Sequence, residues 1–386
     1  MSHTSSDTLR VAAARVLRCL ALVDRHVPML EASGAVAGLA VLLRTGTPVV
    51  KLAACCALSN VANSPRAGPL NLRLLCDPET LAALREMLLS DSLQARRTAA
   101  VLVKVLCSAP PTATRLLEDN VLRCCVKLLH EHPHEFYLGV LTALLESAAQ
   151  QLDREGLRAL AGCGAVDGLA MALSHRRAST IRLDALRALQ ALLCASTVTC
   201  FVRSPCFVAA CWHLLGSTVG IRQRHQCAAL MLEVCTTFAG RLDGATKSRT
   251  TSSDGAAGNV GARLGCQDFV APLQLTPRTL GIAPLLDEDA ACSGSEEDDE
   301  GCPLLLEDAA QVRWLMKLLS ANDTSSQCVA AALIKHLAMR VGNRSIVVKA
   351  GAVHALKEVL SEADKRKRWF IANEAAAALE FLGEKK

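Results

Sequence analysis

The stretch LEASGAVAGLAVLLRTGTPVVKLAACCALSNVAN (30–63) decides the fold. It predicts a short helix that ends at Gly34, a second helix that ends at Arg44, a turn, and a third helix that ends at Asn63. Gly34 can take the positive φ that lets one helix stop and the next begin at a steep angle. Pro48 suits the first turn of the third helix, where a missing N–H costs nothing. The stretch therefore predicts a three-helix unit.

This unit recurs along the chain. Apolar residues are expected two, five, eight and nine places after Gly34, and the same frame begins again at Glu79, Asn120, Gly164, Cys206, Ala310 and Gly351. The steps between frames are 45, 41, 44, 42, 104 and 41 residues. Five of these six steps match the ~40–47 residue period of helical solenoids, and the long step is one repeat plus about 60 residues. Asn120 can begin a frame in the same way as Gly34, because Asn tolerates the left-handed backbone conformation.

Three segments carry a family resemblance: SGAV (33–36), CGAV (163–166) and AGAV (350–353), each followed by a Leu-x-x-Leu-Leu-like stripe. With the third-helix segment AACCALSNVA (53–62), they make the chain resemble the armadillo repeat family. The resemblance implies an all-α fold, a right-handed armadillo-type α-solenoid, with HEAT repeats as the nearest alternative. It implies no single function, because the family includes adhesion, transport, chaperone and flagellar scaffolds.

The predicted organisation has three parts. Residues 1–240 hold an N-terminal cap at 8–25 and about five repeats, and residues 304–386 hold the last two repeats. Residues 241–303 are Gly/Ser/Pro-rich and acidic without apolar periodicity, which predicts a disordered insertion. Within it, Ser293 and Ser295 each precede an acidic residue by three places. That spacing resembles the consensus of acidophilic casein-type kinases and predicts two phosphorylation sites.

Composition favours a protein of the cell interior. The chain is 51% hydrophobic but only 3% aromatic, so the core is expected to consist of Leu, Ala and Val. Charged residues interrupt every apolar run before the ~18 residues of a membrane span, and the N-terminus lacks the apolar core of a signal peptide. We expect a cytoplasmic location and no membrane partner, with nuclear or cytoskeletal/flagellar association as alternatives.

The 18 cysteines are expected to be reduced thiols, because no CxxC pair occurs and no signal for secretion is present. Several are predicted to lie in the core as small apolar side chains: Cys56, Cys125, Cys211, Cys227 and Cys235.

Two short motifs allow a functional and a plainer interpretation. The three histidines of HEHPHE (130–135) could hold a transition metal weakly, but Pro133 breaks a regular geometry, so a solvated loop is favoured. KRKR (365–368) could be a nuclear localisation signal. Because such signals are recognised in extended chain, we favour the alternative that residues 365–368 form the charged start of a folded helix.

Charge suggests where a partner binds. The third helices of an armadillo solenoid line its concave surface, and here several of them begin with basic residues. The insertion 241–303 has five basic and eleven acidic residues, a net charge of −6, against +5 for the chain, so the repeats carry +11. This predicts a basic groove for a partner with an acidic segment. The candidate residues are Lys51, Asn60, Arg97, Lys104, Arg182, Arg187, Arg222 and Arg224.

The opposite charge of the insertion allows a further hypothesis. The acidic residues at 287–300 could act as an intramolecular lid that competes with the partner, and phosphorylation of Ser293 or Ser295 would tighten it. The plainer alternative is a solvated loop that keeps an apolar protein soluble.

Other function classes find little support. The chain has no phosphate loop, no GxSxG and no HExxH, so neither an enzyme nor a cofactor is expected. The basic residues are not interleaved with aromatic residues, which argues against nucleic acid. The Trp/Asn ladder of nuclear-import receptors is absent, because the Asn position holds Asn60 once and otherwise Cys19, Lys104, Glu146, Ala191, His336 and Phe381.

The sequence thus predicts a monomeric, non-enzymatic scaffold or adaptor that binds a segment of a protein partner. The alternative is a co-chaperone or nucleotide-exchange factor for a heat-shock ATPase, suggested by a faint likeness of EHPHEFYLGVLTALLES (131–147) to one such repeat.

Overall fold

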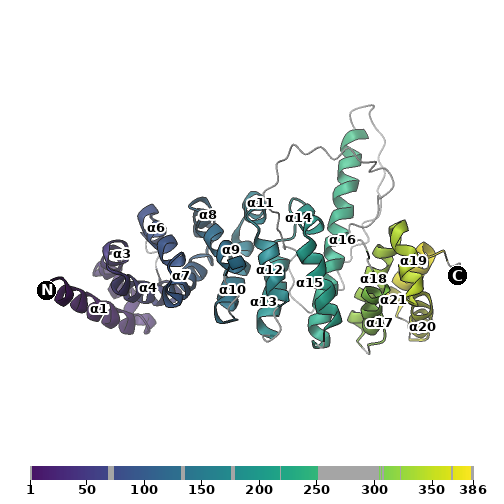
Figure 1. The fold of residues 1–386 in the computed structure, drawn as a ribbon, viewed down its shortest axis with the longest axis horizontal. Helices are drawn as coiled ribbons and strands as arrows, with labels where there is room; N and C mark the ends of the chain where they lie inside the picture. Colours follow the sequence, from purple (N-terminus) through teal and green to yellow (C-terminus); the bar gives the residue numbers. More distant parts are fainter. Residues whose placement is uncertain are drawn as a thin grey trace. The chain divides into compact units, whose positions relative to one another are not determined.

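The computed structural model describes residues 2–67, 74–131, 135–174, 179–217, 219–250, 304, 306, 308–321, 323–366 and 368–383, the side chains of 2–5, 135–137 and 242–250 excepted. Over these ranges the regular structure consists of helices alone (Figure 1). The helices divide into two compact units, Met1–Leu192 and the described part of 193–386. Most of the predicted insertion, with Ser293 and Ser295, lies outside the described residues.

The first unit is a stack of three-helix repeats that follows α1 (Ser2–Leu20) and the short turn η1 (Asp24–His26). Its helices are α2 (Val27–Ala32), α3 (Ala35–Thr45), α4 (Pro48–Asn63), α6 (Pro78–Leu88), α7 (Leu93–Leu106), α8 (Pro110–Glu118), α9 (Val121–Glu131), α10 (Glu135–Gln151), α11 (Arg154–Gly162), α12 (Ala165–Leu173) and α13 (Ser179–Ala191). α1 packs on α4, α4 on α7, α7 on α10, and α10 on α13. These helices, each the last of its repeat, form the third-helix row of the first unit.

The second unit repeats the same pattern. Its helices are α14 (Val198–Arg203), α15 (Pro205–Gly216), α16 (Ile221–Thr250), α17 (Ala309–Leu319), α18 (Thr324–Met339), α19 (Val341–Lys349), α20 (Ala352–Lys365) and α21 (Trp369–Phe381). The third helices α16, α18 and α21 pack in succession, and so do the second helices α15, α17 and α20. Both units are therefore built by the stacking of like helices on like helices.

Four repeats turn between their first and second helices at a left-handed residue. Gly34, Gly164 and Gly351 have φ of 72°, 86° and 86°, and Asn120 has φ of 60°. These positions confirm the pivots predicted from the repeat frame, including the asparagine. Glycine and asparagine are used because a Cβ clashes with the following carbonyl in this region of φ.

The other three repeats begin their second helix differently. Glu79, Cys206 and Ala310 lie inside helices that begin after Asp77, Ser204 and Asp308. In the fifth repeat this changes the buried stripe: Phe207 is fully buried and packs edge-on against Phe201 with ring centroids 5.1 Å apart, whereas Val208 is only half-buried. The predicted stripe was therefore wrong by one residue at this position.

The core consists mainly of Leu, Ala and Val, as composition predicts, with cysteines among them. Cys125, Cys211, Cys227 and Cys235 are buried as predicted. Cys56 is half-exposed, and its neighbour Cys55 occupies the core instead, where burial raises the pKa of the Cys55 thiol. The cysteines that the structure describes are free thiols.

The helix before the predicted insertion is longer than expected. α16 continues to Thr250 rather than ending near Gly240. On the other side, the chain re-enters the second unit at Leu304 and Leu306, which are buried. The buried Asn343 side chain fixes this entry: its Oδ1 accepts from Leu306 N at 3.0 Å, and its Nδ2 donates to Leu304 O at 2.9 Å. A side-chain amide thus orders the approach to α17.

Candidate binding surface

Four charged side chains gather on the third-helix row of the first unit. Lys104 comes from α7, Glu146 from α10, and Asp184 and Arg187 from α13; we call them the charged cluster. Arg187 Nη1 lies 3.2 Å from Asp184 Oδ1, and Gln150 Nε2 lies 3.5 Å from Glu146 Oε1. All four side chains are exposed or half-buried, while the opposite sides of the same helices form the core.

The carboxylates of the charged cluster are incompletely compensated. Partial burial raises the pKa of Glu146; Arg187 and Lys104 act in the opposite direction, and Asp184 adds to the rise. Partial burial likewise raises the pKa of Asp184 against the effect of the same two cations. Removing a carboxylate from water disfavours its charged form unless a cation or a donor replaces the water. An additional cation or hydrogen-bond donor above this cluster would therefore be bound favourably.

Two of the predicted binding residues instead hold neighbouring helices together. Lys51, which is 12% exposed, lies on α4 with its Nζ 2.5 Å from Glu86 Oε2 of α6. Asn60 lies on the same helix, and its Nδ2 donates to Arg18 O in the last turn of α1 at 3.1 Å. A carbonyl at the end of a helix has no partner within that helix, so Asn60 supplies one.

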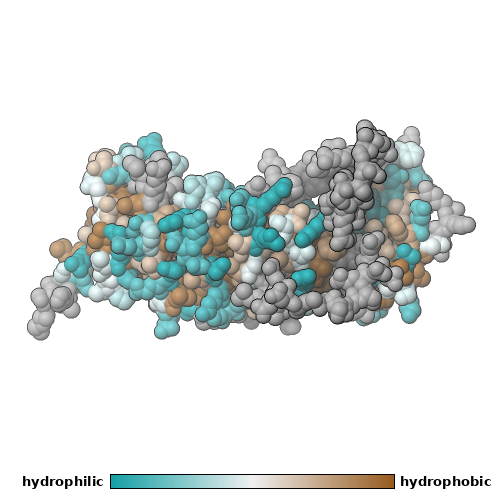
Figure 2. Space-filling model, turned by 90° about the horizontal axis from the view of Figure 1, so that it is seen from above, coloured by the Kyte–Doolittle hydropathy of each residue, from teal (hydrophilic) through white to brown (hydrophobic). Residues whose placement is uncertain are grey.

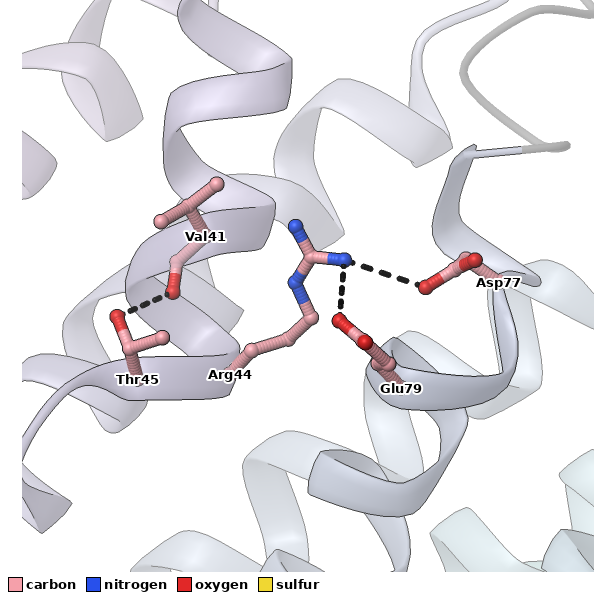
Figure 3. Close-up of polar contacts among 5 residues, drawn as sticks. All are labelled: Val41, Arg44, Thr45, Asp77 and Glu79. Atoms are coloured by element: carbon pink, nitrogen blue, oxygen red, sulfur yellow. Dashed lines mark hydrogen bonds and ion pairs between the residues drawn. The ribbon is translucent and has the colours of Figure 1, made fainter.

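Figure 3 shows a second set of ion pairs between the first two complete repeats, in addition to the pair of Lys51 with Glu86. Arg44 Nη1 at the end of α3 lies 3.2 Å from Asp77 Oδ2 and 3.0 Å from Glu79 Oε2 at the start of α6. Thr45 Oγ1 donates to Val41 O at 2.9 Å in the same turn. An acidic residue in the first turn of α6 also interacts favourably with the helix dipole.

The remaining predicted residues are distributed over α7 and α13 of the first unit and α16 of the second. Arg97 is exposed on α7 and Arg182 is half-buried on α13. Arg222 and Arg224 lie on α16 in the second unit, where Arg224 Nη2 donates to Ser217 O at 3.0 Å. The structure brings Lys104 and Arg187 together, but with two carboxylates between them. The resulting surface carries both signs of charge rather than a uniform positive charge.

Sequence analysis could have found Glu146. Lys104 and Glu146 occupy the same register in successive third helices, as the positions compared with the Trp/Asn ladder show. A search for basic residues alone passed over the acidic residue. Asp184 gave a weaker signal, because it lies seven residues before the register position of α13, and that position holds the buried Ala191.

Both short motifs are partly described. His130 lies at the end of α9, and its Nε2 donates to Gly164 O, 2.8 Å away, at the pivot of the next repeat; residues 132–134 lie outside the described residues. Lys365 ends α20, and Arg368 precedes α21, donating from its backbone N to Ala363 O at 2.8 Å. KRKR therefore spans the junction between α20 and α21 rather than the start of α21.

Two further features bear on the class of the protein. Among the described residues, no group of three or more His, Cys, Asp or Glu side chains is placed to hold a metal ion. In the same part of the chain, no single helix is long and apolar enough to cross a membrane; two helix pairs, bent by 79° and 71° at their breaks, meet the criteria of length and composition together.

Comparison with known proteins gives a fold and no close relative. No protein-family model matches the sequence, and no curated protein matches it either. An engineered protein of known structure matches with a TM-score of 0.60 and 19% identity over 97% of this chain and 74% of its own. A designed armadillo repeat protein in complex with the peptide (KR)4 matches with a TM-score of 0.48 and 19% identity, over 58% of this chain and 91% of its own.

The repeats identify the class of fold. Three-helix units with a short first helix, a left-handed pivot and a stacked third helix recur at the spacing of a helical solenoid. The chain therefore has an armadillo-like α-solenoid fold. At 19% identity the structural likeness extends to the fold alone.

Proposed function

We propose that the chain is a non-enzymatic scaffold that binds a segment of a protein partner along the third-helix row of its first unit. The charged cluster carries this proposal. Three successive third helices contribute to it, and its carboxylates lack full compensation within the chain. A rigid row of helices presents such groups with little ordering cost on binding.

The cluster also suggests the chemistry of the partner. Lys104 and the exposed Arg97 suit an acidic group, in keeping with the acidic partner expected from sequence. Glu146 and Asp184 suit a lysine or arginine. We propose a partner segment that carries both signs of charge, with its basic residue above Glu146. Such complementarity contributes to specificity and association rate more than to affinity.

Site-specific photo-crosslinking tests this proposal. A photoreactive amino acid replaces Lys104 on α7 or, as a matched control, Lys127 on the second helix α9; both lysines are exposed. We expect a discrete partner to be crosslinked from position 104 and not from position 127. The K104E and E146K variants should each reduce its recovery, and the double variant K104E/E146K should not restore binding, because the two charges face different groups of the partner.

Equal crosslinking at both positions, or recovery unchanged by K104E and E146K, would contradict binding at this surface. If the protein recovered at both positions were a heat-shock ATPase, release of labelled nucleotide from that ATPase would test the co-chaperone alternative. A scaffold leaves the release rate unchanged.

A further inference from the structure

The first helix of the chain carries an apolar stripe on its outer surface. Leu9 is 72% exposed, Val16 is 59% exposed and Leu20 is 40% exposed. Ala12 and Ala13, which lie between them in sequence, are also exposed. Leu9, Val16 and Leu20 are spaced by seven and four residues and therefore share one face of a helix. We call these five residues the α1 stripe.

The α1 stripe lies opposite the face that packs on the rest of the unit. Ala14 and Ala21 are buried at 0% and 3% exposure, and α1 packs on α4. At about 100° per residue, Ala14 points about 140° away from Leu9. α1 is thus apolar on both faces, and only one of them is covered among the described residues. Figure 2 shows hydrophobic residues on the surface at the side where the chain begins.

The repeat geometry indicates what covers such a face. α4 packs between α1 and α7, and α7 packs between α4 and α10. α1 has α4 on one side, and its stripe occupies the side where the next helix of the row would lie. The surface is therefore continuous with the stacking interface of the repeats. A surface that continues a row of stacked helices suits a further α-helix, and the simplest occupant is a single amphipathic helix.

One flank of the α1 stripe is basic, and the other carries an ion pair. Arg10 and Arg15 lie about 100° and about 120° from Leu9 on opposite sides of the helix, and both are exposed. Asp7 pairs with Arg10 at 3.3 Å, so Arg15 dominates one flank and a neutralised pair lies on the other. Arg18, also exposed, adds to the positive charge of α1. Two copies of this helix would bring like charges together, which disfavours self-association through the stripe.

We propose that the α1 stripe docks an amphipathic helix of a partner protein, with apolar residues at three- and four-residue spacing and acidic residues beside them. This surface is separate from the charged cluster and does not depend on it. A single helix buries less area than the ~800 Å² per partner of a standard interface, so we expect affinity in the micromolar range.

A synthetic helix tests this surface on the full chain. The probe is a fluorescein-labelled peptide of about 18 residues, long enough to form a helix, with Leu at three- and four-residue spacing, Ala between, and Glu on both flanks. A companion peptide has Lys in place of each Glu. The variants are L9Q/V16Q/L20Q, the charge reversal R10E/R15E, and the control V41Q/L89Q/L93Q, which replaces three other exposed apolar residues of the first unit.

Fluorescence anisotropy should show that the Glu peptide binds the wild type and the control equally. L9Q/V16Q/L20Q should weaken binding about tenfold or more, and R10E/R15E should reverse the preference between the Glu and Lys peptides. All substituted side chains are exposed, so circular dichroism should show unchanged helix content.

Three results would overturn the proposal. One is a Glu peptide that does not bind, or that binds L9Q/V16Q/L20Q as tightly as the wild type. Another is a dimer, seen by light scattering, that L9Q/V16Q/L20Q abolishes, which would make a second copy the occupant. The third is sedimentation with phosphatidylcholine–phosphatidylserine vesicles that the same variant abolishes, which would make a lipid surface the occupant.

Discussion

The two units treat the charges on their third helices in different ways. In the second unit, Lys335 Nζ on α18 lies 2.6 Å from Glu374 Oε2 on α21, and the side chains are 22% and 15% exposed. This pair joins two neighbouring third helices. In the charged cluster of the first unit, by contrast, Arg187 pairs with Asp184 at 3.2 Å within α13 itself, and Glu146 on α10 shares its surroundings with groups of α7 and α13. The same repeat thus supports one face where an ion pair joins neighbouring third helices and another where the carboxylates are only partly compensated.

The largest effect is expected from breaking the closed pair. E374A leaves Lys335 largely buried without its carboxylate. Removing one partner of a fully buried pair costs about 3–5 kcal/mol, and the residual exposure here lowers the expectation to about 2–3 kcal/mol. Denaturant unfolding followed by circular dichroism measures this loss. The double variant K335M/E374L should lie within about 1 kcal/mol of the wild type, because apolar residues of similar size often replace a buried pair without loss.

If K335M/E374L proved as unstable as E374A, the loss would come from packing and not from an uncompensated charge. If E374A had no effect, the face would be as open as that of the first unit, and the contrast between the units would fail.

The next largest effect should come from acid. His336 follows Lys335 on α18, and its Nδ1 is buried without a hydrogen-bond partner among the described residues. Burial, and then Lys335, lower the pKa of His336 from 6.5 to about 4, against an opposing effect of Glu374. Between these values the unfolded chain binds the proton and the folded chain does not, so stability falls as pH falls from 6.5 toward about 4.

The variant H336L should remove this part of the acid sensitivity. Relative to the wild type, it should gain about 2 kcal/mol of stability between pH 7 and pH 4.5, after allowance for the partial exposure of the ring. Denaturant unfolding at a series of pH values measures the difference. H354L, which replaces an exposed histidine of α20, is the control and should follow the wild type. A constant difference between H336L and the wild type across this range would contradict the assignment to His336.

Much of this fold could be predicted from the sequence because the repeat amplifies weak signals. A single Asn-Val pair such as that at Asn120 predicts little, but its place in a frame of constant period identified the left-handed residue. The stripes of second helices were predicted for the same reason. The exceptions lie where a capping residue replaces the pivot: Ser204 begins α15 one turn before Val208 and brings Phe207 into the core.

The candidate site was less predictable because charge alone does not show what a side chain contacts. Lys51 is basic and begins a third helix, as a groove residue would, yet Glu86 of the next repeat binds it. The partner lies 35 residues away, on a different helix, and only the stacking of repeats brings the two together. Asn343 is similar: its role depends on buried backbone groups at Leu304 and Leu306 that no local pattern indicates.

The smallest effect on stability should come from the open face. Because burial raises the pKa of Glu146, the folded state disfavours its charge, and this cost is present at neutral pH and disappears as Glu146 becomes protonated at low pH. E146Q should therefore stabilise the protein at pH 7 by less than about 1 kcal/mol, because the side chain is still partly exposed.

Whether E146Q raises or lowers stability distinguishes a binding surface from a structural one. The control E155Q replaces an exposed glutamate in the first turn of α11 and should lower stability by a few tenths of a kcal/mol, because an acidic residue there favours the helix dipole. A carboxylate whose removal stabilises the chain does not contribute to the stability of the fold. If E146Q were destabilising, Glu146 would resemble Glu374, and both units would have closed faces. Suppose that E146Q both stabilises the chain and abolishes crosslinking of the partner from position 104. That result would show that Glu146 lowers the stability of the fold and is needed for binding.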